Sequence, residues 1–318
     1  MSPPILAKLL EFDHGITAID TDYVRPMMDA SHLVVDEGRA AFIDAGTNHS
    51  VPNLLAALDA KGVARTHVDY VFTTHVHLDH AGGAGELLRH LPNASCVVHP
   101  RGARHLVDPA KLVAGTRAVY GDETYARLYG DLVPVPESRV IAPEDGARFR
   151  LGGRALEIIH TPGHAQHHFC IVDAAHGAIF AGDTFGLSYR IFDHEGHPFV
   201  VPTTTPVQFD PEALHASIDR ILAYAPRAVY ITHYGERLGV PRLGAELKSR
   251  LDEMVGFARR MAEAPDRGPK LREGLSAMLL RWLDAHGWRG DAATVREWWQ
   301  TDIDLNAQGL EVWLDRGR

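Results

Sequence analysis

The sequence has little cysteine and no long apolar run. Cys96 and Cys170 are the only cysteines among 318 residues, too few for a disulfide framework. No apolar run approaches the roughly 20 residues that a membrane-spanning helix requires. Residues 1–15 lack the positively charged start and apolar stretch that are typical of a secretory signal peptide. We therefore expect a cytoplasmic protein that does not enter a membrane.

Positive charge is also scarce relative to negative charge. The chain has 32 Lys and Arg against 41 Asp and Glu, which gives a net charge of −9. Such a balance offers no basic surface for nucleic acid and no polybasic patch for an anionic membrane. We expect a small-molecule substrate instead. The length and the 45% of hydrophobic residues fit one large globular domain, with or without a smaller appendage.

The pattern of apolar runs and turns occurs twice along the chain. Each half reads as a β-hairpin, a helix and a buried strand that ends in Thr-His. These segments are 31–46, 51–61 and 70–72 in the first half, and 168–183, 211–224 and 228–231 in the second. Two such halves can bury their sheets face to face and cover the outer faces with helices. The sequence thus predicts an α/β protein with a four-layer αββα sandwich.

Two helical stretches lie outside this repeat. Residues 102–133 form a tyrosine-bearing insertion. From residue 243 onward apolar residues recur at helical spacing, which predicts two helices and then two short ones at 291–300 and 307–315. All five tryptophans fall in this region, where packing or a dimer surface explains them better than a cofactor. We expect a main domain of residues 1–240 and a helical extension of residues 241–318, and we favour a homodimer.

Four possible metal ligands follow the strand at 70–72 within six residues: His75, His77, Asp79 and His80. Such groups seldom gather beside a buried strand without a function. A loop at this point can turn the first two side chains towards one cation and the last two towards another. Imidazole and carboxylate ligands suit zinc, and also iron or manganese.

Three more candidate ligands occur at turns after strands. His164 follows the tight turn at Pro162-Gly163, Asp183 follows the strand at 178–181, and His233 ends the strand at 228–231. One such histidine alone would more often be structural. Three at corresponding strand ends, together with the first cluster, indicate that they complete a metal site.

These motifs resemble those of the metallo-β-lactamase-fold superfamily over about residues 30–235. They are His75-x-His77-x-Asp79-His80, Thr161-Pro162-Gly163-His164, Gly182-Asp183-Thr184 and Thr232-His233. The resemblance implies two divalent ions, with zinc favoured over iron or manganese. It assigns His75, His77 and His164 to the first ion, Asp79, His80 and His233 to the second, and Asp183 to both. It also implies that Asp44 and His168 lie next to the ligands and contact them without binding a metal ion.

The details of the resemblance favour the branch of glyoxalase II and the lactonases. Asp183 stands where some β-lactamases have cysteine, and His77 where flavo-diiron oxidases have glutamate. A lactonase-type tyrosine three residues after Asp183 is absent, since that position is Gly186. Segments 185–190 and 202–206 resemble a poorly characterised bacterial and archaeal subgroup and are expected to wall the mouth of the site. We predict Phe185 and Tyr189 as substrate-pocket residues.

The resemblance implies a hydrolase that cleaves an ester, a thioester or a lactone. A hydroxide shared by the two metals would attack the carbonyl, and Asp79 would be the catalytic residue that orients it and moves its proton. Two alternatives stay open at this point. One is a phosphodiesterase, and the other is a diiron protein that binds or reduces oxygen on the same fold.

Overall fold

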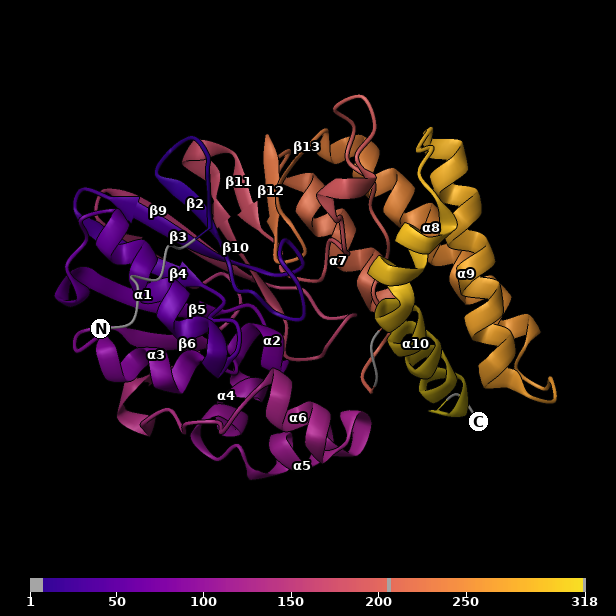
Figure 1. Ribbon diagram of the computed structural model, residues 1–318. Helices are drawn as coiled ribbons and strands as arrows, with labels where there is room; N and C mark the ends of the chain where they lie inside the picture. The colour runs from indigo at the N-terminus through magenta and orange to yellow at the C-terminus, as the bar shows by residue number, and fades with distance from the viewer. Residues whose placement is uncertain (1–7, 205–206, 317–318) are drawn as a thin grey trace.

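The computed structural model describes residues 8–204 and 207–316, which form two β-sheets packed face to face (Figure 1). The first sheet has seven strands in the order β1 (Leu9–Glu11), β2 (Ile16–Asp20), β3 (Ala30–Asp36), β4 (Arg39–Ile43), β5 (Val68–Thr73), β6 (Ser95–Val98) and β7 (Val140–Ile141). The second has six in the order β13 (Gly235–Leu238), β12 (Ala228–Ile231), β11 (Ala178–Phe180), β10 (Phe169–Asp173), β9 (Arg154–His160) and β8 (Arg148–Leu151).

The inner faces of the two sheets share one apolar cluster, to which both contribute buried side chains such as Val34, Phe72, Ile158, Phe169 and Phe180. The outer face of the first sheet is covered by α1 (Val51–Ala60) and α3 (Ala84–His90), and that of the second by α7 (Pro211–Ala223) and α8 (Val240–Arg260). The predicted four-layer αββα sandwich is confirmed. Burial of apolar side chains on both faces of each sheet stabilises this arrangement.

Parallel pairing brings the candidate residues to one edge of the sandwich. Strands β4 and β5 are parallel in the first sheet, and β11 and β12 are parallel in the second. The carboxyl ends of parallel strands point in the same direction. The two sheets join at this edge through backbone hydrogen bonds from Phe169 N to Thr74 O (2.9 Å) and from Ala30 N to Thr232 O (2.8 Å).

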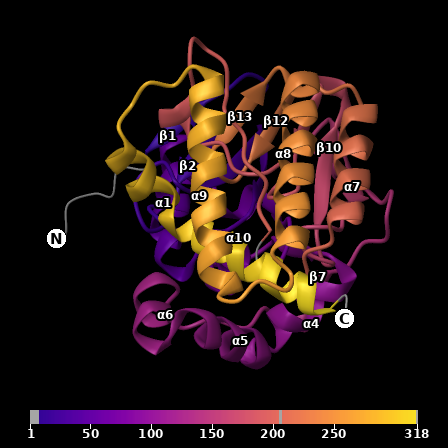
Figure 2. The same cartoon turned by 90° about the vertical axis from the view of Figure 1, so that its right-hand side faces the viewer.

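A helical insertion lies between β6 and β7 and comprises α4 (Pro100–Val107), α5 (Ala110–Tyr120) and α6 (Asp122–Leu128). It follows the short α2 (Leu78–Ala81) and α3 in the chain and lies below the sheets in Figure 1. Figure 2 shows its helices beneath α10 (Ala292–Arg316). The insertion is thus close to the C-terminal part of the chain, although the two are far apart in the sequence.

The C-terminal region contains α8, α9 (Arg267–His286) and α10. The prediction of two short helices at 291–300 and 307–315 was wrong, because α10 runs through both without a break. The segment between them has no glycine or proline, and Ile303 and Asn306 are buried on its inner side. These helices share an apolar cluster with the outer face of the second sheet. The domain boundary at residue 240 stays a prediction.

The tryptophans of the C-terminal region pack within the chain. Trp282 and Trp299 are buried in this cluster, and Trp288, Trp298 and Trp313 pack against it. None of the helices in the described ranges is both long enough and apolar enough to span a lipid bilayer.

Candidate metal centre

The seven predicted ligands converge at the edge of the sandwich where the parallel strands end. Asp79 and His80 lie on α2, and the others lie on loops that follow β5, β9, β11 and β12. Their donor atoms form three overlapping groups, and within each group all atoms lie within 4.8 Å of one another: His75, His77 and His164; His75, His80 and Asp183; and Asp79, His80 and His233.

The first group consists of three imidazoles whose ring nitrogens face one another. His77 Nδ1 lies 2.8 Å from His75 Nε2 and 3.1 Å from His164 Nε2. Burial and the neighbouring His80 hold the pKa of His75 well below its usual value, and burial together with His164 lowers the pKa of His77 to about 3. Neutral rings each offer a lone pair. Three lone pairs that converge in this way suit a cation.

The second group combines one carboxylate with two imidazoles. Asp79 Oδ2 lies 3.7 Å from His80 Nε2 and 3.7 Å from His233 Nε2. Ligand atoms about 2.0–2.2 Å from a tetrahedral zinc ion are about 3.3–3.6 Å from one another. The spacing is therefore close to that of a coordination shell.

Asp183 lies between the two groups. Its Oδ2 is 3.4 Å from His164 Nε2, whereas its Oδ1 is 3.4 Å from His80 Nε2 and 3.5 Å from His233 Nε2. Burial opposes its ionisation, but His80, His233 and His164 together hold the pKa of Asp183 well below its usual value. One carboxylate thus directs one oxygen to each group, which is the arrangement of a bridging ligand.

Two buried donor atoms of this cluster make no hydrogen bond within the described ranges: Asp183 Oδ1 and His80 Nε2. The two atoms lie 3.4 Å apart, but a buried polar atom without a hydrogen bond is costly and calls for an explanation. A cation bound between the two atoms would satisfy both. The donor set and the spacing therefore fit a pair of divalent ions.

Hydrogen bonds behind the cluster fix the orientation of its rings. Asp44 Oδ2 accepts hydrogen bonds from His80 Nδ1 (2.7 Å) and Thr232 Oγ1 (2.9 Å), and its Oδ1 accepts one from Thr74 N (2.8 Å). His233 Nδ1 donates to the carbonyl oxygen of Met28 (2.9 Å). With its Nδ1 proton held in this way, each ring would present the Nε2 lone pair to a bound cation. Asp44 lies where the sequence predicted a supporting residue.

His168 holds the loop that carries Asp183. Its Nδ1 lies 2.9 Å from Thr161 Oγ1, and its Nε2 accepts a hydrogen bond from the Asp183 backbone N (3.3 Å). Gly182 passes close to this ring with φ of +46°, and a Cβ there would lie 2.7 Å from His168 Nε2. Only glycine fits both the conformation and the space.

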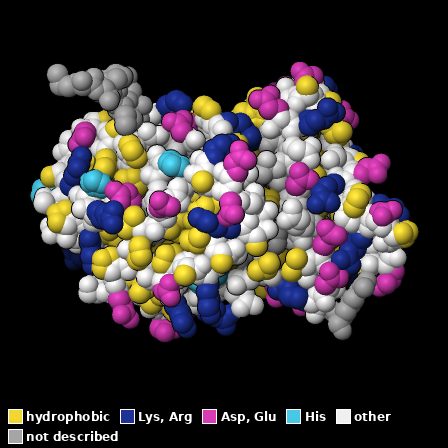
Figure 3. All heavy atoms as spheres, turned by 60° about the horizontal axis from the view of Figure 1, so that its bottom comes forward, with side chains coloured by type: hydrophobic (Ala, Val, Ile, Leu, Met, Phe, Trp, Pro, Cys, Tyr) yellow, Lys and Arg dark blue, Asp and Glu magenta, His cyan; other side chains and the backbone are white. Residues whose placement is uncertain are grey.

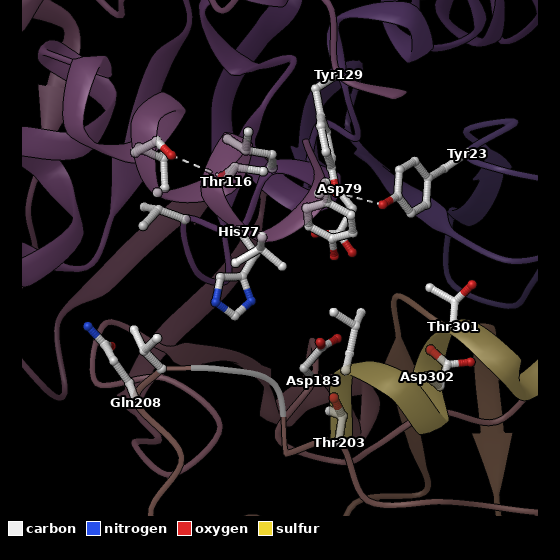
Figure 4. Close-up of a pocket in the computed structure, with 18 of the residues that line it drawn as sticks. Tyr23, His77, Asp79, Thr116, Tyr129, Asp183, Thr203, Gln208, Thr301 and Asp302 are labelled. Carbon is white, nitrogen blue, oxygen red and sulfur yellow. Dashed lines mark hydrogen bonds between the residues drawn. The ribbon is translucent and has the colours of Figure 1, made fainter. Parts of the chain in front are cut away.

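The donor cluster opens into a cavity of about 290 Å³ (Figure 4). His77, Asp79, Asp183 and His233 line one part of it. Apolar and aromatic side chains from the β2–β3 loop, the insertion and α10 line much of the rest, among them Tyr23, Met28, Leu112, Val119, Tyr120, Tyr129 and Leu305. In Figure 3, which turns the lower side of Figure 1 forward, hydrophobic side chains gather on the surface.

The prediction of Phe185 and Tyr189 as pocket residues was wrong, because neither lines this cavity. Both are almost fully buried. Phe185 belongs to the apolar cluster under the C-terminal helices, and Tyr189 packs against Trp299 and donates a hydrogen bond to Asp302 Oδ2 (3.1 Å). Leu187, between them, does line the cavity.

The segment 202–206 was predicted to wall the mouth of the site, and Thr203 lines the cavity. Thr205 and Pro206 lie outside the described residues.

Several cavity residues were not anticipated from the sequence. Tyr23 and Tyr129 meet through their hydroxyls at 2.8 Å, and Asp302 enters the cavity from α10. Tyr129 was noted only as part of the insertion. Asp302 was not predicted as a cavity residue because a break between two helices was expected at this point, whereas it lies within the continuous α10. No local pattern marks Tyr23, because its role depends on a contact with a distant element.

Comparisons with known proteins find relatives of this chain. The family model described as the metallo-beta-lactamase superfamily matches residues 24–233. The metallo-beta-lactamase fold-containing protein ST1585 of Sulfurisphaera tokodaii is 30% identical over 226 residues, which are 70% of this chain and 78% of that protein. A hydroxyacylglutathione hydrolase of Aeromonas hydrophila is 31% identical over 194 residues, but the match spans only 60% of this chain and 55% of that enzyme.

Solved structures show the same fold over nearly the whole chain. The crystal structure of ST1585, from Sulfolobus tokodaii, has a TM-score of 0.66 at 25% identity and covers 93% of this chain and 98% of its own. The metallo-beta-lactamase family protein TTHA1429 of Thermus thermophilus has a TM-score of 0.67 at 20% identity, with 95% and 94% covered. Together with the donor cluster, the family model and the hydroxyacylglutathione hydrolase relative support a metal-dependent hydrolase. The chain belongs to the metallo-β-lactamase superfamily.

Proposed function

We propose that this protein is a hydrolase that cleaves an ester, a thioester or a lactone in a small molecule with the help of two divalent ions, preferably zinc. The position of Asp183 carries the proposal, because its two oxygens face two separate groups of donors at 3.4–3.5 Å. His75, His77 and His164 would hold one ion, Asp79, His80 and His233 the other, and Asp183 both. Such a pair lowers the pKa of a bound water to about 7 and polarises a carbonyl group.

Asp79 is proposed as the catalytic residue that accepts and passes on a proton. Its side chain is 21% exposed and lines the cavity, whereas that of Asp183 is 6% exposed. Asp79 can therefore meet a substrate and solvent while it stays next to His80 and His233. A carboxylate within reach of both the nucleophile and the leaving group suits this role.

The surroundings of the site support a small acyl substrate. Apolar and aromatic side chains line much of the cavity, and the chain is acidic overall. The relative from Aeromonas hydrophila is named for the hydrolysis of hydroxyacylglutathione, a reaction on an acyl group. We also propose a cytoplasmic location, with which the two buried, unpaired cysteines agree. A homodimer stays a prediction.

The test combines metal analysis with a substrate panel. Elemental analysis of the purified protein should give about two divalent ions per chain, and a panel of lactones, thioesters and esters should be turned over faster than bis-(p-nitrophenyl) phosphate. His75→Ala should remove bound metal and activity together, because His75 belongs to two of the three donor groups. His90→Ala, a change in α3 outside the donor groups, is the control.

If His75→Ala kept the metal content and the turnover of wild type, the proposal would be wrong. Preferred cleavage of the phosphodiester would favour the phosphodiesterase alternative. Bound iron with an absorption band that responds to oxygen would favour the redox alternative, because zinc has no redox chemistry.

A further inference from the structure

One face of α5 is turned towards the cavity. Leu112, Gly115, Thr116 and Val119 all line it, and their spacing of three and four residues places them on the same side of a helix. None of the residues of α5 is fully buried. The apolar side chains of this face therefore border open space next to the donor cluster.

Gly115 is the feature of this face that packing does not explain. It lies in the middle of α5, where glycine destabilises a helix relative to alanine. Its φ is not in the left-handed region, so the backbone does not require glycine. A Cβ built on it meets nothing within 4 Å. The glycine thus leaves room in the wall of the cavity at a cost to the helix.

Other elements complete an apolar channel opposite α5. Leu305 of α10, Leu187 and Met28 line the same cavity as the donor cluster. Val207 also lines it and is 58% exposed, and Val119 of α5 is 42% exposed. Polar side chains such as Gln208 and Thr301 line other parts of the cavity. An apolar chain gains from burial along the apolar part of the wall, where a polar chain would lose hydration.

We propose that this cavity binds the apolar chain of an acyl substrate, with the carbonyl group at the donor cluster and the chain against α5 at Gly115. The substrate class is then a medium-chain ester, thioester or lactone. This inference rests on the proposed hydrolase function and names its substrate. Gly115 is the residue that sets the permitted chain length.

The first test is a series of p-nitrophenyl esters from acetate to decanoate with the zinc-loaded protein. Each buried methylene should raise kcat/KM by about fourfold until the cavity is full. If esters are cleaved but kcat/KM does not rise with chain length, the inference is wrong and the hydrolase function stands. If no ester, thioester or lactone is cleaved, the hydrolase function itself fails.

The second test fills the space at Gly115. Gly115→Leu should lower kcat/KM for the octanoate ester by about tenfold or more, because the new side chain takes the place of at least two methylenes, and should change acetate little. Leucine favours helix more than glycine does, so the variant should melt no lower than wild type. Gly256→Leu in α8 is the matched control, since that glycine also has space around it but does not line the cavity.

A binding measurement does not depend on turnover. Calorimetric titration of the zinc-loaded protein should show tighter binding of decanoate than of butyrate. Gly115→Leu should abolish most of this difference, and Gly256→Leu should keep it. Equal binding of the two acids to wild type, or an unchanged difference in Gly115→Leu, would overturn the proposal.

Discussion

Asp44 is a single buried carboxylate that joins the ends of several strands. It accepts hydrogen bonds from Thr74 after β5, from Thr232 after β12 and from the ring of His80. It therefore fixes the position of a ligand without lying in any of the three donor groups itself. Residues in such positions commonly decide how tightly a metal site holds its ion.

Asp44→Asn should weaken zinc binding by about 10–100-fold, because an amide holds the His80 ring less firmly than a carboxylate does. Competition with a chelating indicator measures the dissociation constant. Asp59→Asn, an exposed change at the end of α1, should bind zinc as wild type does. An unaltered affinity in Asp44→Asn would show that Asp44 does not orient the ligand.

His32 gives a prediction about stability and pH. It is buried between Phe180 and Tyr230, and burial lowers its pKa from 6.5 to about 4. Between these values the unfolded chain takes up a proton that the folded chain does not, so stability falls as the pH falls from 6.5 to 4. The full difference is about 3 kcal/mol.

His32→Phe removes this contribution. Its free energy of unfolding should therefore fall less steeply than that of wild type between pH 6.5 and 4, and the two should run in parallel above pH 7. Urea unfolding at a series of pH values measures both curves. Parallel curves across the whole range would contradict the prediction.

At the scale of elements, α10 is held to the cavity wall through Asn306. The Thr204 backbone N donates to Asn306 Oδ1 (2.6 Å), Thr204 Oγ1 donates to the Asn306 carbonyl (3.0 Å), and Asn306 Nδ2 donates to the Pro202 carbonyl (3.3 Å). This contact joins the helix to the segment that carries Thr203. It therefore sets where one cavity wall stands.

Asn306→Ala should lower the free energy of unfolding by about 1–3 kcal/mol, because it leaves a buried backbone N–H of Thr204 without its acceptor. Chemical denaturation measures the loss. Gln300→Ala, on the exposed side of the same helix, should cost less than about 0.5 kcal/mol. Equal stability of the two variants would mean that the hydrogen bonds of the Asn306 side chain contribute little to the free energy of unfolding.

Elements with strong local signals could be predicted from the sequence. Helix α7 was expected at 211–224 and extends from Pro211 to Ala223. Its start could be predicted because Asp210 caps it and Pro211 occupies its first turn. Strand β12 matched its expected residues 228–231. The edge strands β1 and β7 have three and two residues, too few for a pattern to appear. The continuity of α10 between residues 300 and 307 was not predicted, because the polar residues of this segment are also typical of a loop.

In the candidate site, too, residues in short sequence motifs could be predicted, whereas contacts between distant segments could not. The seven donors could be predicted because each lies in a short motif at a strand end. The cavity could not, since it is lined by residues of α5 and of α10, which lie far apart in the chain. Phe185 and Tyr189 were misassigned for this reason: the C-terminal helices cover them.

For the whole molecule, the metal ions should tie the two sheets together. The ligands lie on α2 and on loops that follow strands of both sheets, from His75 after β5 to His233 after β12. Ligands that bind only the folded state stabilise it, by about 4 kcal/mol when present at 1,000 times the dissociation constant. Removal of metal with EDTA should therefore lower Tm by several degrees, and added zinc should restore it. Calorimetry that gives the same Tm with and without chelator would contradict a bound metal pair.

The donors lie at or just after strand ends, whereas many of the other residues that line the cavity lie on α5 and α10, outside the sandwich. Substitutions on these helices can therefore reshape the cavity without changing a donor. A library randomised at Leu112, Thr116 and Leu305 should change which esters are cleaved while the content of bound metal stays unchanged. Such separation makes the scaffold a good starting point for directed evolution.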